Sequence, residues 1–134
     1  MLTVRHLVDL VYPALAAGDR DALLELLDPE FEATFTEGLP FGIGGTHRGA
    51  IAAQRDGWWA IGRAFDVRAE PEEWIECADG RLLVTGRYVG SVRTSGRPIN
   101  AAFAHLWTAR GSRLVRLWQL TDSAQWIDPK GAQT

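Results

Sequence analysis

The chain lacks several features that would direct it to particular classes of protein. Cys77 is its single cysteine, which excludes an internal disulfide and a cluster of thiolate ligands. Its apolar runs are only a few residues long, whereas a membrane-spanning helix needs about 20. Basic residues (14) and acidic residues (17) are interspersed, with a formal net charge of −3 and no basic stripe. We therefore expect neither a nucleic-acid partner nor a membrane partner.

The composition is that of one folded domain. The 134 residues are 46% hydrophobic, which is enough for a real core, and we expect one domain over residues 1–128 and a frayed tail over 129–134. Arg5, His6 and Asp9 interrupt the apolar stretch that a secretory signal peptide would need, so we expect a cytoplasmic protein. Six tryptophans stand beside five phenylalanines and two tyrosines, and some of the indoles could line a cavity.

Helical patterns come first along the chain and strand patterns follow. Apolar residues recur at helical spacing over residues 3–17, 19–27 and 48–64. Residues 31–36 alternate like a strand, and the glycine-rich segment 37–46 predicts a loop. The later strands are predicted at 67–78, 81–93, 98–110 and 113–121, separated by strong turn signals. Helices followed by long antiparallel strands predict an α+β fold.

The segment from Phe103 to Trp126 is the most informative part of the sequence. It predicts a hairpin that runs into a short helix opened by Asp122. Phe103, His105 and Trp107 alternate and therefore share one face of the first strand. An imidazole between two aromatic side chains indicates a pocket, although a buried histidine with a purely structural partner is the alternative reading.

The order of elements resembles that of the nuclear transport factor 2-like superfamily, and more narrowly its SnoaL-like, ketosteroid-isomerase-related branch. The motifs that carry the resemblance lie at residues 16–19, 45–49, 86–88, 103–107 and 119–124. The resemblance implies a curved, mostly antiparallel sheet wrapped around N-terminal helices, forming a cone-shaped apolar cavity, commonly in a homodimer through the sheet. It does not imply one reaction, because the superfamily includes isomerases, polyketide cyclases, dehydratases, epoxide hydrolases and non-catalytic binding modules.

The resemblance also nominates two catalytic residues. His105 falls near the position where steroid isomerases place a protonated acid in the oxyanion hole, so its imidazole could donate a hydrogen bond to a substrate carbonyl or shuttle a proton. Asp122 falls near the acid/base carboxylate of the polyketide cyclases. Asp122 followed by Gln125 also matches a helix capping box, which is a structural alternative of equal weight.

Glu37 is a further candidate for catalysis, and other residues are candidates for the cavity wall. Glu37 lies near the general base of steroid isomerases, but a carboxylate beside Gly38 is more typical of a solvated loop. Tyr12 resembles the oxyanion-hole tyrosine of those enzymes but lies one residue out of register, which turns it by about 100°. The substrate-binding set that we expect is listed together: Tyr12, Phe35, Trp59, Trp107 and Gln119.

These expectations lead to one main hypothesis and two alternatives. The main hypothesis is a cofactor-free isomerase or cyclase that acts on an apolar carbonyl compound, polyketide-like or steroid-like, with Asp122 moving the proton and His105 stabilising the oxyanion. It requires both groups to open onto one cavity. The alternatives are a non-catalytic ligand-binding or dimerisation module and an epoxide hydrolase using Glu37, Arg87 and Asp122. The three histidines have no ligand spacing, so no metal is expected.

Overall fold

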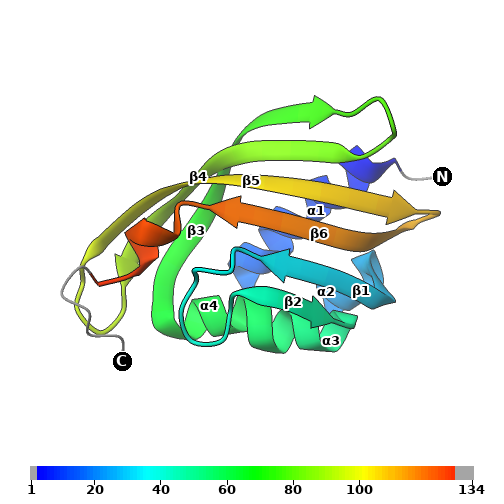
Figure 1. The fold of residues 1–134 in the computed structure, drawn as a ribbon. Coiled ribbons are helices and arrows are strands. Elements are labelled where there is room, and N and C mark those ends of the chain that lie inside the picture. Colours follow the sequence, from blue (N-terminus) through cyan, green and yellow to red (C-terminus); the bar gives the residue numbers. More distant parts are fainter. Residues whose placement is uncertain (1–2, 129–134) are drawn as a thin grey trace.

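The computed structural model describes residues 3–128, and the predicted tail at 129–134 lies outside the described residues. Three helical segments precede the long strands (Figure 1). The helices are α1 (Val4–Ala17), α2 (Arg20–Leu26), α3 (Ala50–Ala52), a π-helical turn (Ala53–Trp58), α4 (Trp59–Ala64) and a final 3₁₀ turn (Ser123–Trp126). The strands are β1 (Leu27–Phe35), β2 (Gly45–Arg48), β3 (Phe65–Glu76), β4 (Leu82–Val92), β5 (Pro98–Arg110) and β6 (Arg113–Thr121).

The strands form one curved sheet in the order β2-β1-β6-β5-β4-β3. Every neighbouring pair is antiparallel except β1 and β6, which run parallel. Helix α1 contacts β3, β5 and β6, and the segment from α3 to α4 runs beside β1, β2 and the start of β3 (Figure 1). The predicted α+β class and curved, mostly antiparallel sheet are therefore confirmed.

Helix α1 forms where the apolar spacing predicts it. The Thr3 hydroxyl accepts a hydrogen bond from the backbone N–H of His6 and so caps the first turn. The helix ends at Gly18, whose φ of 65° is the left-handed conformation that glycine adopts without strain. The side chains that face the sheet are buried, namely Leu7, Val8, Val11 and Ala14. This helix forms one wall of the interior.

The helix predicted at 48–64 begins at Ala50, two residues later than expected, and it is not a regular α-helix throughout. Residues Gly45–Arg48 instead form a short edge strand that pairs with β1 over residues 32–35. The strand was hidden because it has only four residues and its start falls in the glycine-rich segment 37–46, which is typical of a loop. Beyond Gly49 the helix widens into a π-turn at Ala53–Trp58, a local irregularity that apolar spacing does not predict.

Gly86 is required by close packing in the middle of the sheet, beside the bulge of β3 between Pro71 and Glu73. A Cβ atom there would overlap the carbonyl oxygen of Glu70 and lie 2.8 Å from the ring of Phe103. We expect Gly86→Ala to lower the free energy of unfolding by about 1–3 kcal/mol in urea titrations. Gly62→Ala is the control, since a Cβ there meets no atom within 4 Å. Equal stability of both variants would contradict this reading.

Candidate functional site

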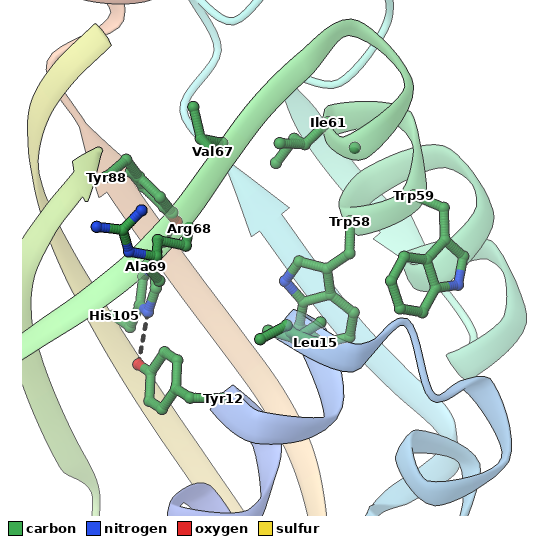
Figure 2. A pocket seen from close by; sticks show the side chains of 12 residues that line it. Tyr12, Leu15, Trp58, Trp59, Ile61, Val67, Arg68, Ala69, Tyr88 and His105 are labelled. Carbon is green, nitrogen blue, oxygen red and sulfur yellow. Dashed lines mark hydrogen bonds between the residues drawn. The ribbon is translucent and has the colours of Figure 1, made fainter. Parts of the chain in front are cut away.

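A pocket of about 130 Å³ lies between α1, the helical segment around Trp58 and Trp59, and strands β3 to β5 (Figure 2). Most of its wall is apolar, with Leu15, Trp58, Trp59, Ile61, Val67 and Ala69 among the lining residues. Its polar groups are few: Tyr12 from α1, Arg68 from β3, Tyr88 from β4 and His105 from β5. A mostly apolar hollow with a few convergent polar groups is typical of small-molecule sites.

His105 is held between two tyrosine hydroxyls. Its Nδ1 atom lies 2.7 Å from the hydroxyl oxygen of Tyr12, and its Nε2 atom lies 2.6 Å from that of Tyr88. The ring stacks on Phe103 with a centroid distance of 4.0 Å, and only 3% of the residue is exposed. Figure 2 shows Tyr12 reaching His105 from the helix side of the pocket. As expected, Phe103, His105 and Trp107 lie on the same face of β5. This face is buried, so the imidazole points inward.

Each tyrosine hydroxyl has a further partner. The indole N–H of Trp107 donates to the Tyr12 oxygen over 3.3 Å, and the amide nitrogen of Gln119 donates to the Tyr88 oxygen over 3.1 Å. The other end of Gln119 accepts from the backbone N–H and the hydroxyl of Thr36, at 3.1 and 3.2 Å. We call the chain Trp107–Tyr12–His105–Tyr88–Gln119 the His105 network.

Burial sets the charge state of this network. Desolvation by burial disfavours the charged imidazolium and lowers the pKa of His105 to about 3. The same cause raises the pKa of both Tyr12 and Tyr88 above the usual tyrosine value. His105 is therefore neutral near pH 7 and both tyrosines keep their protons. This differs from the expected imidazole that exchanges a proton with substrate at neutral pH.

The structure does not bring Asp122 and His105 together. Asp122 is exposed just beyond β6 and does not line the pocket. It stands at the start of the 3₁₀ turn, where its side chain makes no capping hydrogen bond, so the capping-box interpretation does not hold either. Glu37 is exposed in the turn after β1. The expected pairing of Asp122 with His105 is therefore absent, because the Asp122 side chain is exposed while His105 is buried at the pocket wall.

The other predicted residues divide into wall and support. Tyr12 and Trp59 line the pocket. Phe35 is fully buried against Trp58, while Trp107 and Gln119 are fully buried and hydrogen-bond to Tyr12 and Tyr88, respectively.

Sequence reasoning nominated only Tyr12, Trp59 and His105 among the lining residues and missed the others, Tyr88 and Trp58 among them. Tyr88 alternates inward with Val84 and Gly86 on β4, and this alternation was a usable signal. Trp58 was predicted as core; it is buried as expected but also forms part of the wall.

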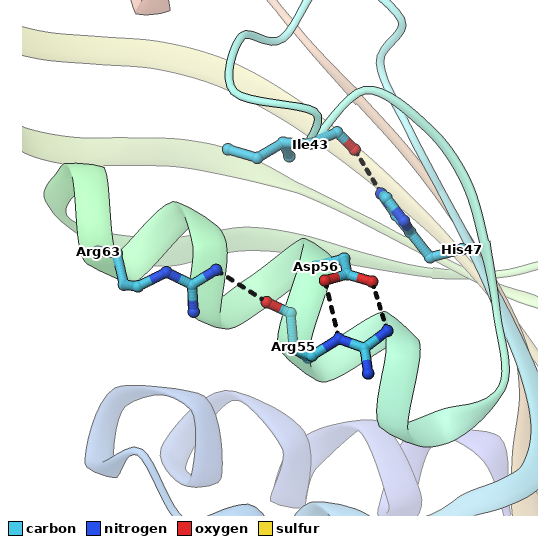
Figure 3. A network of polar contacts seen from close by, with 5 residues as sticks. All are labelled: Ile43, His47, Arg55, Asp56 and Arg63. Carbon is cyan, nitrogen blue, oxygen red and sulfur yellow. Dashed lines mark hydrogen bonds and ion pairs between the residues drawn. The ribbon is translucent and has the colours of Figure 1, made fainter. Parts of the chain in front are cut away.

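A second set of polar contacts lies outside the pocket, on the helical segment and on the loop and strand β2 beside it (Figure 3). His47 Nε2 lies 2.7 Å from the carbonyl oxygen of Ile43, and Arg55 forms a two-bond ion pair with Asp56. The Arg55 guanidinium holds the pKa of the Asp56 carboxyl below its usual range. Within residues 3–128, no group of three or more His, Cys, Asp or Glu is placed to hold a metal ion. In the same range no helix is long and apolar enough to cross a bilayer.

Comparison with known proteins agrees with this architecture. A nuclear transport factor 2-like protein from Burkholderia thailandensis is 27% identical, with a TM-score of 0.84 over 96% of this chain and 100% of its own. TerC, co-crystallised with polyporic acid, is 26% identical, with a TM-score of 0.76 over 88% and 90% of the two chains. A suspected polyketide cyclase from Sinorhizobium meliloti is 27% identical, with a TM-score of 0.68 over 85% and 93%.

The sequence itself was compared with curated proteins and with family models. No curated protein matches it. The model of the SnoaL-like domain matches residues 5–117, which is most of the chain. The chain therefore belongs to the SnoaL-like family, within the nuclear transport factor 2-like superfamily.

Proposed function

We propose that the protein binds a small apolar molecule with a hydrogen-bond acceptor, such as the carbonyl of a polyketide-like or steroid-like ring, and acts on it as a cofactor-independent isomerase or cyclase. The observation that carries the proposal is the His105 network at the wall of an otherwise apolar pocket. Two similar structures support it, since one is a suspected polyketide cyclase and the other, TerC, was co-crystallised with polyporic acid.

The chemistry that these residues can perform is polarisation of a carbonyl. A preorganised hydroxyl in an apolar site stabilises negative charge that develops on oxygen, and such donors commonly supply a large share of catalysis. Since Asp122 and Glu37 do not line the pocket, a proton removed beside the carbonyl would pass to water or to another group of the substrate. The proposal thus keeps the expected oxyanion stabilisation and drops the expected carboxylate base.

A pocket-filling variant tests the binding site. We expect 1-tetralone, a small aromatic ketone, to alter tryptophan fluorescence, because Trp58 and Trp59 line the pocket. Ala69→Phe fills the pocket from β3 and should weaken binding at least about tenfold, a change of roughly 1.4 kcal/mol. Ala102→Phe is the matched control, because Ala102 is exposed on β5 and does not line the pocket. Equal affinity of both variants would place the ligand elsewhere.

The main alternative is a non-catalytic binding module, which the missing pocket carboxylate and the strongly depressed pKa of His105 favour. The two readings differ in one observable. A catalyst that stabilises an enolate should accelerate deuterium uptake beside the carbonyl of 1-tetralone in D₂O, as followed by NMR, whereas a binding module should not. No observation favours epoxide hydrolysis: Glu37 and Asp122 are exposed, and Arg87 is bound to Asn100.

We also propose a homodimer through the outer face of the sheet. Trp118 and Leu120 on β6 are each 47% exposed there, and Leu106 of β5 stands directly beside Trp118 in the register. Monomers rarely expose contiguous apolar patches, and a second copy would cover this one. Arg116 and Glu32 are neighbours across β6 and β1 and put both charge signs at the border of this patch, which suits self-association.

We also propose a cytoplasmic location, since Cys77 is the single cysteine and leaves no internal disulfide.

Light scattering after gel filtration tests the dimer. We expect twice the chain mass for the wild type and a shift to monomer for Trp118→Glu, because a charge would be buried without a partner in the interface. Ile51→Glu is the control, since Ile51 is 66% exposed on α3, away from the sheet face. A monomeric wild type at high micromolar concentration would end this proposal.

A further inference from the structure

The two ends of the His105 network have fixed hydrogen-bond directions. An indole nitrogen can only donate, so the Tyr12 oxygen accepts from Trp107. The Gln119 amide is oriented by the backbone N–H of Thr36, which can only donate and therefore faces Oε1. The amide nitrogen of Gln119 is thereby directed at Tyr88, whose oxygen also accepts. Each tyrosine oxygen thus accepts one hydrogen bond from a residue other than His105. Each hydroxyl must therefore donate its own proton to some other acceptor.

The imidazole can accept a hydrogen bond from only one of these two hydroxyl groups. Neutral His105 has one N–H and one acceptor nitrogen, and each ring nitrogen faces one tyrosine oxygen. The acceptor nitrogen receives the hydroxyl proton of one tyrosine, and the ring N–H donates to the other tyrosine. The hydroxyl proton of that other tyrosine has no partner inside the network. The network therefore has one more hydroxyl proton than it has acceptors. This conclusion follows from the numbers of donors and acceptors and does not depend on small shifts in distance.

Burial indicates which tyrosine keeps the unused proton. Tyr88 is 7% exposed, and its hydroxyl sits in the interior between His105 and Gln119. Tyr12 is only half-buried and its hydroxyl is less deeply enclosed. An unpaired donor costs least where water or a ligand can reach it. The favoured arrangement therefore has Tyr88 donating to Nε2 and Nδ1–H donating to Tyr12.

We propose that His105 is held as the neutral Nδ1–H tautomer and that Tyr12 presents the one unpaired hydroxyl proton of the network to the pocket. His105 is then a positioning residue that orients Tyr12, and Tyr12 makes the contact with the ligand. The inference also names Tyr12 as the donor that the acceptor of the ligand meets, and this part rests on the proposed function. The pocket selects a molecule that offers a lone pair, and it discriminates against one that can only donate.

The tautomer can be measured in the ligand-free protein by two-bond ¹⁵N–¹H correlation of the histidine rings. His6→Gln and His47→Gln assign the other two histidines, so the remaining ring belongs to His105. We expect a single protonated nitrogen at Nδ1 between pH 6 and 8. A proton on Nε2, or on both nitrogens, would overturn the assignment. This result does not need a ligand, so it stands or falls separately from the proposed function.

A ligand pair tests the role of Tyr12. We expect wild-type protein to bind 1-tetralone roughly three- to tenfold more tightly than tetralin, which lacks the carbonyl, in line with one net hydrogen bond. Tyr12→Phe should abolish the difference, whereas Val67→Ala, which trims the apolar wall, should weaken both ligands and keep the ratio. A ratio that survives in Tyr12→Phe would show that another donor meets the carbonyl. If neither ligand binds while the Nδ1–H tautomer is observed, only the proposed function has failed.

Discussion

We expect the stability of the protein to fall steeply in mild acid because His105 cannot be protonated in the folded state. Its folded pKa is lowered from 6.5 to about 3, so between these pH values the unfolded chain takes up a proton that the folded chain refuses. The free energy of unfolding should then drop by about 1.4 kcal/mol per pH unit below about pH 6.5, levelling near pH 3. Above pH 6.5 both states are neutral at this residue and the contribution disappears.

Urea titrations at pH 7, 6 and 5 measure this slope. His105→Gln removes the group and should flatten the slope relative to the wild type, while His6→Gln removes an exposed histidine outside the network and serves as the matched control. Should His105→Gln fail to fold, NMR titration of the wild type gives the same information, since the His105 ring should stay neutral down to about pH 4. An imidazole that titrates near pH 6.5 would show that the network is open to water.

Gln119→Leu should cause a large loss of stability although it exchanges side chains of similar size. Gln119 is fully buried and satisfies the backbone N–H of Thr36 and the hydroxyl of Tyr88 at once. Leucine fills similar space but leaves both groups without that partner. The Thr36 N–H left without this partner costs about 1–3 kcal/mol, and the lost bond to Tyr88, which keeps its bond to His105, costs about 0.5–1.5 kcal/mol. We therefore expect a loss of about 2–4 kcal/mol in the free energy of unfolding.

The neighbouring Leu120→Gln variant is the control for this effect. Leu120 points to the outer face of the sheet and is 47% exposed, so the same type of exchange there should change stability by less than about 0.5 kcal/mol when the protein is dilute and monomeric. Unfolding curves that coincide for Gln119→Leu and the wild type would contradict the hydrogen bonds described for the network.

Much of the fold could be predicted because its signals are local. The apolar spacing of α1 and the glycine at its end specify that helix, and turn residues separate β4, β5 and β6 at the predicted places. Strand alternation alone also placed His105 inward beside Phe103 and Trp107. Edge strand β2 and the π-turn were missed, because each depends on tertiary pairing or packing that leaves no periodic pattern in the sequence.

The site was only partly predictable because it is assembled from distant elements. Residues of α1, β4 and β5 meet in the His105 network, and no spacing in the sequence reveals that Tyr12 and Tyr88 face the two nitrogens of one ring. Asp122 was misleading for the opposite reason. A family position indicates a role only if the backbone carries the side chain inward, and here Asp122 is exposed at the start of the 3₁₀ segment.

The crystal structure of the protein with 1-tetralone bound tests the central claim most directly. The account predicts that the ring lies among Leu15, Trp58 and Val67, with the carbonyl oxygen within about 2.7–3.2 Å of the Tyr12 hydroxyl oxygen. A ketone bound elsewhere, or one in the pocket whose carbonyl points away from the His105 network, would contradict it.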